Sequence, residues 1–397
     1  MSAVFSPVRA RTGISLFFFT NGAMMAGIMP RYPEIKAAFE LSNTAFGFMV
    51  AVGPIASVAA SALPAPLIRR FGAQPVALAW TCAMAFAMML AGFAPHFFVF
   101  ALALAIAGFS DALVDSAQNV HGVRVEDAYG KTIINSLHAL WSLGATTGGV
   151  VGAWAASQHI PLSIHLSAVA LTLIGLATIA TVLGRLPGNP RPVAATESEV
   201  TPSGKLPTGA WAVIVPLALL AIAGVLTEDV ASNWAALYVV QVVGATAAVG
   251  GIGYTVMLGS QFIGRLLGDP ATDRWGSVAV IRMGGVMIAV GGVLIIAFPV
   301  LPVVMVGYAL CGYGCATIVP TAYAAAGRLP GLPEGAGITY VSWLLRMGFV
   351  ASSPFIGAVS DVTSLRVALG LLAVGGLAII YLARVVRPTE PSPAASA

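Results

Sequence analysis

Runs of apolar residues, each about 20 residues long, recur along the whole chain and constrain its fold more than any other feature. One helix of that length crosses a hydrocarbon layer ~30 Å thick, and only helices and closed barrels satisfy their backbone polar groups inside such a layer. The sequence therefore predicts an all-α polytopic membrane protein with twelve transmembrane helices. The expected spans are 13–32, 44–67, 75–94, 97–119, 132–157, 161–185, 210–240, 247–268, 277–298, 301–326, 336–360 and 365–386.

The composition and charge pattern agree with a lipid environment. Charged residues make up only 9% of the chain, far below the roughly 25% of a soluble domain. The net charge of +4 requires no nucleic-acid partner, because the basic residues gather in the loops on one side of the predicted membrane. Only Arg31, Lys36 and Arg366 fall on the other side. The positive-inside rule then predicts a multi-pass protein of the cell inner membrane, embedded in the lipid bilayer with both termini cytoplasmic.

One long polar stretch divides the chain. Residues 187–209 are rich in proline and carry charged side chains without an apolar period, which predicts a cytoplasmic linker. The linker separates an N-terminal six-helix bundle, 1–186, from a C-terminal six-helix bundle with a short cytoplasmic tail, 210–397. Two related halves of this kind are typical of secondary transporters.

A weak internal repeat supports this division. Arg70-Phe71-Gly72 follows the second predicted helix, and Arg274-Trp275-Gly276 follows the eighth at an offset of 204 residues. The same offset places Gly144 on Gly348. Because the halves stay in register at two separate places, we expect them to have the same fold.

The second copy of this loop resembles the helix 8 to 9 loop signature of the major facilitator superfamily. Gly264 to Asp269, followed by Asp273 to Gly276, carries the resemblance. It implies the facilitator fold of two six-helix bundles, with a cytoplasmic latch between them. The expected latch residues are Arg70, Gly72, Asp269, Asp273, Arg274 and Gly276. The first copy of the loop departs from the family pattern, because Arg69 stands where Asp is usual. The alternative to a latch is a loop that is charged only because it is cytoplasmic.

Further segments resemble the fucose-permease-like branch of that superfamily and its uncharacterised bacterial relatives. They are Asp115 to Gly122 in the fourth predicted helix, Glu228-Asp229 with Trp234 and Tyr238 in the seventh, and Ser353 to Gly357 in the eleventh. The resemblance implies a secondary active transporter that works by alternating access. These motifs do not name a substrate. The acids inside the predicted spans indicate coupling to protons, and a cavity with several hydrogen-bonding groups favours a small polar solute such as a sugar or an organic acid.

Ionisable groups inside a membrane are costly, so each one indicates a function. Asp111, Asp115 and Asn119 follow one another at four-residue spacing in the fourth predicted helix, which places them on one face. We interpret this face as a cavity wall, with the two carboxyls as candidate proton carriers and Asn119 as a solute contact. Asp115 lies near the cytoplasmic end of its span, so a local pairing with Arg124 is the alternative.

The seventh predicted helix carries two further candidate proton carriers, Glu228 and Asp229. Neighbouring residues point about 100° apart on a helix, so we expect only one of them to face the cavity. Trp234 and Tyr238 lie one turn apart and form a candidate aromatic wall for the solute. An aromatic belt at the outer membrane interface is the alternative.

Arg346 lies about ten residues into the eleventh predicted helix, near the membrane midplane. Its planar guanidinium suits carboxylates and phosphates. Either it binds an anionic group of the solute, or it pairs with Asp111, Glu228 or Asp229 and is released when that acid takes a proton. Because the internal acids outnumber this internal Arg, the sequence favours the pairing.

Three more polar residues complete the candidate site. His138 in the fifth predicted helix is a candidate proton relay, and Trp141 next to it on the same face is a candidate solute contact. Asn21 in the first helix offers the solute a donor and an acceptor. The alternatives are a neutral His138 bonded to Asn119 or to the backbone, and an Asn21 bonded to a neighbouring helix.

The fifth predicted helix also carries Gly144, Gly148 and Gly152 at four-residue spacing. This places three glycines on one face, and we expect that face to contact another helix closely. The stretch is similar to the helix 5 signature of facilitator-type drug antiporters, although it lacks their proline. Proton-coupled efflux of a drug or amphiphilic metabolite is therefore an alternative to solute uptake.

The remaining signals argue against other classes of protein. Gly130-Lys131-Thr132 ends like a phosphate-binding loop, but Val125 stands where the first glycine is needed. The sequence shows no nucleophile, metal or cofactor constellation, so we expect no enzyme, no metal and no cofactor. We expect the chain to function as a monomer. A non-transporting membrane sensor is the alternative from a different class.

Overall fold

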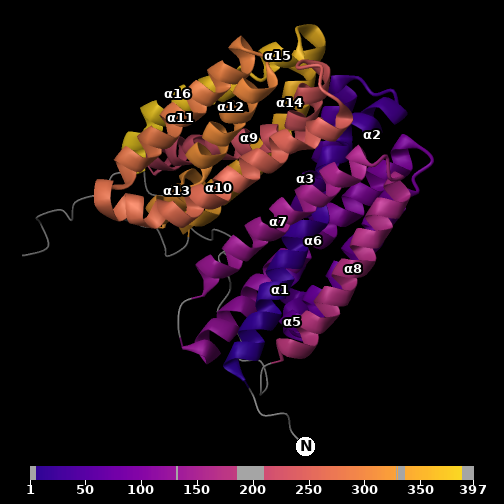
Figure 1. The fold of residues 1–397 in the computed structure, drawn as a ribbon. Helices are drawn as coiled ribbons and strands as arrows, with labels where there is room; N and C mark the ends of the chain where they lie inside the picture. The colour runs from indigo at the N-terminus through magenta and orange to yellow at the C-terminus, as the bar shows by residue number, and fades with distance from the viewer. Residues whose placement is uncertain (1–5, 131–132, 186–209, 328, 330–335, 387–397) are drawn as a thin grey trace, which may run out of the picture.

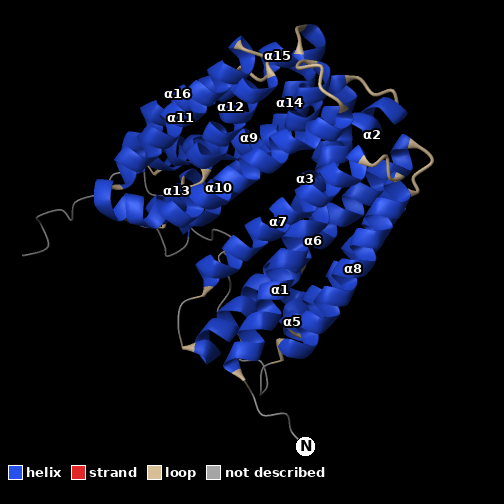
Figure 2. Ribbon diagram, in the orientation of Figure 1, coloured by secondary structure: helices blue, strands red, loops and turns tan. Residues whose placement is uncertain are grey.

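The structure is a computed structural model that describes residues 6–130, 133–185, 210–327, 329 and 336–386. Within these ranges the chain is helical and contains no strand (Figure 2). The all-α class predicted from the apolar runs is therefore confirmed. The predicted linker, 187–209, lies outside the described residues.

The helices of the N-terminal half begin at Pro7. The side chain of Ser6 accepts a hydrogen bond from the backbone N–H of Arg9, and Pro7 occupies the first helical position, where its missing N–H costs nothing. The elements are α1 (Pro7–Ala26), η1 (Met29–Arg31), α2 (Tyr32–Ala38), α3 (Asn43–Ala60), α4 (Pro64–Phe71), α5 (Ala73–Gly92), α6 (Phe97–Tyr129), α7 (Ile134–Ser157) and α8 (Leu162–Leu183).

The C-terminal half repeats the pattern of long helices with short breaks. Its elements are α9 (Trp211–Gln241), α10 (Ala247–Trp275), α11 (Ser277–Ala297), α12 (Leu301–Cys315), α13 (Ile318–Ala326), α14 (Ala336–Val362), α15 (Leu365–Ala368), α16 (Leu371–Leu382) and η3 (Ala383–Val386).

Nine helical segments of the described chain are long and apolar enough to cross a membrane. The helices α7, α10 and α14 are not among these nine, although each lies on a predicted span. The described helices thus follow the expected ranges, while the count of twelve spans stays a prediction.

Several helix ends differ from the predicted ones. The span expected to end at 119 continues as α6 to Tyr129, and Gly130 then ends the helix with a left-handed backbone, φ 72°. The polar residues after 119 mark where the apolar run ends, but they do not prevent the helix from continuing. The span expected over 44–67 is divided, because α3 ends at Ala60 and Pro64 begins a new helix, α4.

The repeated loop has the same backbone conformation in both halves. Gly72 between α4 and α5 has φ 87°, and Gly276 between α10 and α11 has φ 79°. Both angles lie in the left-handed region that favours glycine. The internal repeat read from the sequence is therefore present in the structure at this turn.

The two halves form separate groups of helices that meet at one end (Figure 1). The helix α3 packs against α14, and α7 packs against α10. We call the end that carries α2 and α15 the closed end, and the end at which α1 begins the open end, because the two groups diverge toward it (Figure 1). Gly47 and Gly357 lie where α3 and α14 cross, and an added Cβ at either would clash with a backbone carbonyl of the other helix.

Candidate functional site

A cavity of about 310 Å³ lies between the two halves. Residues of α1, α3, α6 and α7 line one side, and residues of α9, α10 and α14 line the other. Most lining side chains are apolar. The charged side chains in the lining are Asp111, Glu228, Asp229 and Arg346.

Asn21 of α1, a predicted solute contact, is buried and lies outside the cavity lining, but it bonds two residues that do line the cavity. Its side-chain amide donates to Oδ1 of Asp111 on α6 at 2.7 Å, and its carbonyl oxygen accepts from the indole Nε1 of Trp141 on α7 at 2.7 Å. Gln118 is a weaker donor to the same oxygen, at 3.5 Å. Asn21 therefore fixes Asp111 and Trp141 relative to each other, as expected of a residue that bonds neighbouring helices.

Asp229 of α9 is buried and is held by donors from its own half. Asn233 donates to its Oδ1 at 2.6 Å, and Ser353 of α14 donates to its Oδ2 at 2.9 Å. Ser352 is a second hydroxyl donor to Oδ2. Three donors to one carboxylate stabilise its charge and fix its orientation.

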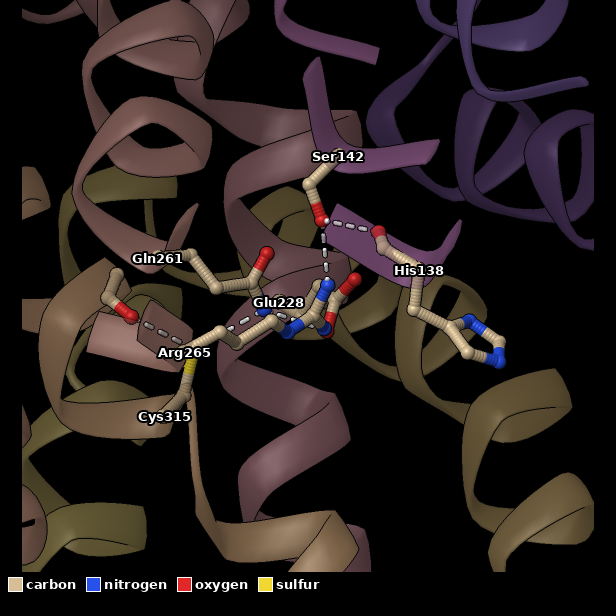
Figure 3. A network of polar contacts seen from close by, with 7 residues as sticks. His138, Ser142, Glu228, Gln261, Arg265 and Cys315 are labelled. Atoms are coloured by element: carbon tan, nitrogen blue, oxygen red, sulfur yellow. Dashed lines mark hydrogen bonds and ion pairs between the residues drawn. The ribbon is translucent and has the colours of Figure 1, made fainter. Parts of the chain in front are cut away.

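Glu228, the neighbour of Asp229, belongs to a different network (Figure 3). Gln261 of α10 donates to its Oε2 at 2.8 Å, and the guanidinium of Arg265 lies 3.7 Å from the same oxygen. Arg265 also donates to the Oγ of Ser142 on α7 at 2.9 Å, which connects the two halves. In Figure 3 the ring of His138 points away from this network, and only its backbone carbonyl accepts from Ser142.

Both acids of the seventh predicted helix line the cavity, which corrects the expectation that only one would. Glu228 is directed toward α10 and Asp229 toward α14. Since the cavity borders α9, α10 and α14, it reaches both directions even though the two side chains diverge.

Arg346 of α14 lines the cavity and is half-buried. The pairing with Asp111, Glu228 or Asp229 that the sequence favours is not formed. Among the described residues, Arg346 makes no hydrogen bond or ion pair, and the partner of Glu228 is Arg265 instead. Each of the three acids already has other donors: Asp111 accepts from Asn21, Glu228 interacts with Gln261 and Arg265 of α10, and Asp229 accepts from three side chains.

Besides Asn21, three predicted polar residues lie away from the cavity lining: Asp115, Asn119 and His138. Asp115 is exposed and accepts from Asn119 at 3.1 Å and from Gln118 at 3.3 Å. The ring of His138 packs edge-on against Phe18, with 5.2 Å between centroids, and does not line the cavity. The structure therefore brings none of these three residues to the cavity.

Trp234 and Tyr238 are fully buried and also lie outside the cavity lining. The indole of Trp234 donates to Ser353 at 3.2 Å and packs edge-on against Phe46 of the other half, while the hydroxyl of Tyr238 donates to the carbonyl of Ile295. The structure therefore places Trp234 and Tyr238 neither in a wall that faces the solute nor in an aromatic belt at the membrane interface. The aromatic side chains that do line the cavity are Tyr32, Trp141, Tyr254 and Phe349.

The expected latch residues lie at the open end, where the halves are apart. Asp273 and Arg274 are exposed, and neither forms an ion pair within the described part of the chain. The guanidinium of Arg70 lies over the ring of Phe71, and that of Arg274 lies over Trp275. The side chain of Asp269 lies outside the described residues. The latch therefore stays a prediction for another conformation.

Sequence reasoning did not single out Arg265, Gln261 or Ser142. Arg265 lies three residues before the end of its predicted span, so its position groups it with the basic residues near the loops. Gln261 and Arg265 are one turn apart, which places both on one face of α10 toward Glu228. That spacing is the signal that indicates a polar face.

A family model described as the Major Facilitator Superfamily matches residues 14–267, more than half of the chain. The chain belongs to the major facilitator superfamily. This confirms the family predicted from the loop between the eighth and ninth spans. Members of this family are membrane transporters rather than enzymes, so the chain is a multi-pass membrane protein that transports a small solute.

Curated relatives from bacteria cover nearly the whole chain. The uncharacterized transporter y4wD of Sinorhizobium fredii (strain NBRC 101917 / NGR234) is 26% identical, over 94% of this chain and 97% of its own length. An uncharacterized MFS-type transporter of Yersinia pestis is 26% identical over 97% of each chain. The membrane protein MosC of Rhizobium meliloti is 24% identical over 92% of this chain and 87% of its own length.

Solved structures with the same fold include the nucleoside transporter NupG, with a TM-score of 0.71 and 14% identity over 96% of this chain and 98% of that one. The transporter FucP in its outward conformation has a TM-score of 0.63 and 16% identity, over 96% of this chain and 98% of that one. These likenesses confirm the two-bundle facilitator fold.

Proposed function

We propose that this transporter moves a small polar solute by alternating access and couples that movement to protons. The observation that carries the proposal is the cavity between the two halves, whose walls hold acidic side chains from both halves and one basic side chain. Charged groups at this depth are costly in a membrane and mark solute and ion pathways. A site between halves that pack together at one end and diverge toward the other suits exposure to each side in turn.

The proton is carried by an acid of the cavity, and Asp111 is the first candidate. Asp229 accepts from three donors, which hold its charge in place, whereas Asp111 accepts from Asn21 alone among the described residues. Glu228 is the second candidate, because its protonation would weaken its interaction with Arg265.

The open end is the cytoplasmic end in this proposal. The basic loops of the sequence gather on that side, and the same rule places both termini in the cytoplasm and the protein in the inner membrane. The conformation described here is then the inward-open one, and the monomer is the working unit because the cavity lies within one chain.

The test is a transport measurement in proteoliposomes that contain a pH-sensitive dye. Sugars, organic acids and cationic drugs are added outside, one at a time. Symport predicts that one polar solute acidifies the lumen and that Asp111→Asn abolishes this proton movement but retains solute exchange. The variant Asp127→Asn, an exposed acid at the end of α6, is the matched control. If only cationic amphiphiles act and the lumen becomes alkaline, the function is efflux. A protein that moves none of these solutes contradicts the proposal.

A further inference from the structure

Arg346 is the charged side chain of the cavity without a partner among the described residues. Asp111 accepts from Asn21, Glu228 interacts with Gln261 and Arg265, and Asp229 accepts from three donors. The guanidinium of Arg346 donates no hydrogen bond to a side chain or carbonyl among the described residues.

The guanidinium of Arg346 has no acceptor for its donors among the described residues. Arginine keeps its charge in proteins and offers five donors in a planar fork, so it cannot lower the cost of burial by losing a proton. Its neighbours along α14, Leu345, Phe349 and Val350, also line the cavity and are apolar. A cation in such surroundings gains most from an anion that supplies two acceptor oxygens.

The opposite wall supplies the complementary group. Oδ1 of Asp111 accepts from Asn21, while no described residue donates to its Oδ2. Asp111 therefore has room for a donor that comes from a bound solute. Because α6 and α14 belong to different halves, a solute that contacts both Asp111 and Arg346 would bridge the two bundles.

From this arrangement we propose that the solute is a small carboxylate that also carries a hydroxyl or amino hydrogen-bond donor. Its carboxylate binds Arg346 in the fork geometry, and its donor binds Asp111. The cavity volume of about 310 Å³ lies at the small end of ligand sites and suits a solute of this size. The assignment rests on the proposed function, which it narrows from polar solutes in general to organic anions.

The test is ligand-dependent thermal stability of the purified full-length protein in detergent, because a ligand that binds only the folded state raises the melting temperature. Two probe pairs isolate the two contacts. Gluconate and sorbitol differ by a carboxylate in place of a hydroxymethyl group, and malate and succinate differ by one hydroxyl. We expect gluconate or malate to bind at least tenfold more tightly than its matched probe.

Variants then assign the contacts. Arg346→Gln should weaken anion binding at least tenfold, and Arg346→Lys should retain part of it because the charge remains without the fork. Asp111→Asn should reduce the preference for malate over succinate. Arg282→Gln, which removes an exposed arginine outside the cavity, should change nothing. If Arg346→Gln does not fold, the lysine variant and the probe pairs still decide the question.

Two outcomes overturn the inference. In the first, sorbitol binds as tightly as gluconate, and Arg346→Gln binds gluconate as tightly as the wild type does. In the second, no carboxylate stabilises the wild type at concentrations up to tens of millimolar. In the first case proton-coupled transport of a neutral solute stands, since the dye measurement in proteoliposomes tests it separately.

Discussion

Arg265 joins the two halves beside the cavity, through Glu228 in its own half and Ser142 in the other. A hydrogen bond to a charged group contributes about 1.5–3 kcal/mol when it is shielded from water. The side chains of Arg265 and Glu228 are 31% and 28% exposed, so solvent screening reduces the contribution to about 1 kcal/mol. We expect Ser142→Ala to remove this link and to let the halves separate further at the open end.

Spin labels measure that separation directly. Asp127 at the end of α6 and Trp275 at the end of α10 are exposed, belong to different halves and lie toward the open end. In a cysteine-free background, labels at these two positions should show a longer and broader distance distribution in Ser142→Ala. Ser142→Thr keeps the hydroxyl and should restore the wild-type distribution. Identical distributions in all three proteins would exclude a linking role for Arg265.

The charged residues of the cavity were predictable from the sequence, but their pairing was not. Asp111, Glu228, Asp229 and Arg346 stand out because each interrupts an apolar run. Which acid meets which base depends on how helices of the same half rotate and pack, and the spacing along one helix does not contain that information. This is why Arg265, near the end of its span, replaces Arg346 as the partner of Glu228.

Among the helices, α1 and α7 lie close together along the face that carries the spaced glycines of α7. The expected close contact is confirmed, because an added Cβ at Gly144, Gly148 or Gly152 would clash with the backbone carbonyl of Phe19, Ala23 or Gly27. Each of these three carbonyls belongs to α1 or its end, so the glycine face determines how near α7 lies to the helix that carries Asn21. The bond from Trp141 to Asn21 depends on that spacing.

We therefore expect Gly144→Ala to destabilise the protein by about 1–3 kcal/mol, the usual cost of overpacking a well-packed contact. Gly175→Ala in α8 is the matched control, since nothing lies within 4 Å of its added Cβ. Alanine is the better helix former, so the control should be neutral or slightly more stable. Thermal unfolding followed by intrinsic tryptophan fluorescence gives both values. Equal melting temperatures for the two variants would mean that α1 and α7 adjust freely.

Helix existence was easier to predict than helix ends. The apolar runs located the spans because the bilayer requires them, whereas the extension of α6 to Tyr129 and the break at Pro64 depend on capping and on proline. The arrangement of the two bundles around a cavity came from the family resemblance, since no local pattern specifies it.

In the molecule as a whole, the carboxylate of Asp361 bonds one half to the other at the closed end. Asp361 is exposed, one residue from the end of α14 and beyond the predicted span. Its Oδ1 accepts from the backbone N–H of Asn43 at 2.9 Å and its Oδ2 from that of Thr44 at 2.7 Å, at the N-terminus of α3. The side chain of Asn43 also donates to Ser360. An anion at a helix N-terminus is favourable, so Asp361 of one half stabilises its contact with the other.

The protonation of Asp361 sets the pH range of this contact. Partial burial raises the pKa of Asp361, but the hydrogen bonds from Thr44, Asn43 and Ser42 lower it by more, so the net pKa lies below its ordinary value. A lowered pKa means that the stabilisation is complete above ~4 and is lost as the pH falls through the lowered value. Lys36 of α2 also interacts electrostatically with Asp361. Between pH 5 and 8 the closed end should therefore not respond to pH through this residue.

Asp361→Asn removes the charge at every pH. We expect this to change the populations of the two conformations of the transporter. An interaction of about 1 kcal/mol at a helix N-terminus corresponds to roughly a fivefold change in population. The labels at Asp127 and Trp275 should then report more of the state in which the open end is shut, with shorter distances and no further change on acidification. Glu40→Gln, an exposed acid at the closed end without a hydrogen-bond partner among the described side chains, should keep the wild-type distribution. If Asp361→Asn keeps it as well, the charge of Asp361 does not hold the closed end, and closure depends on the packing between the halves, including the glycine contacts of α3 and α14.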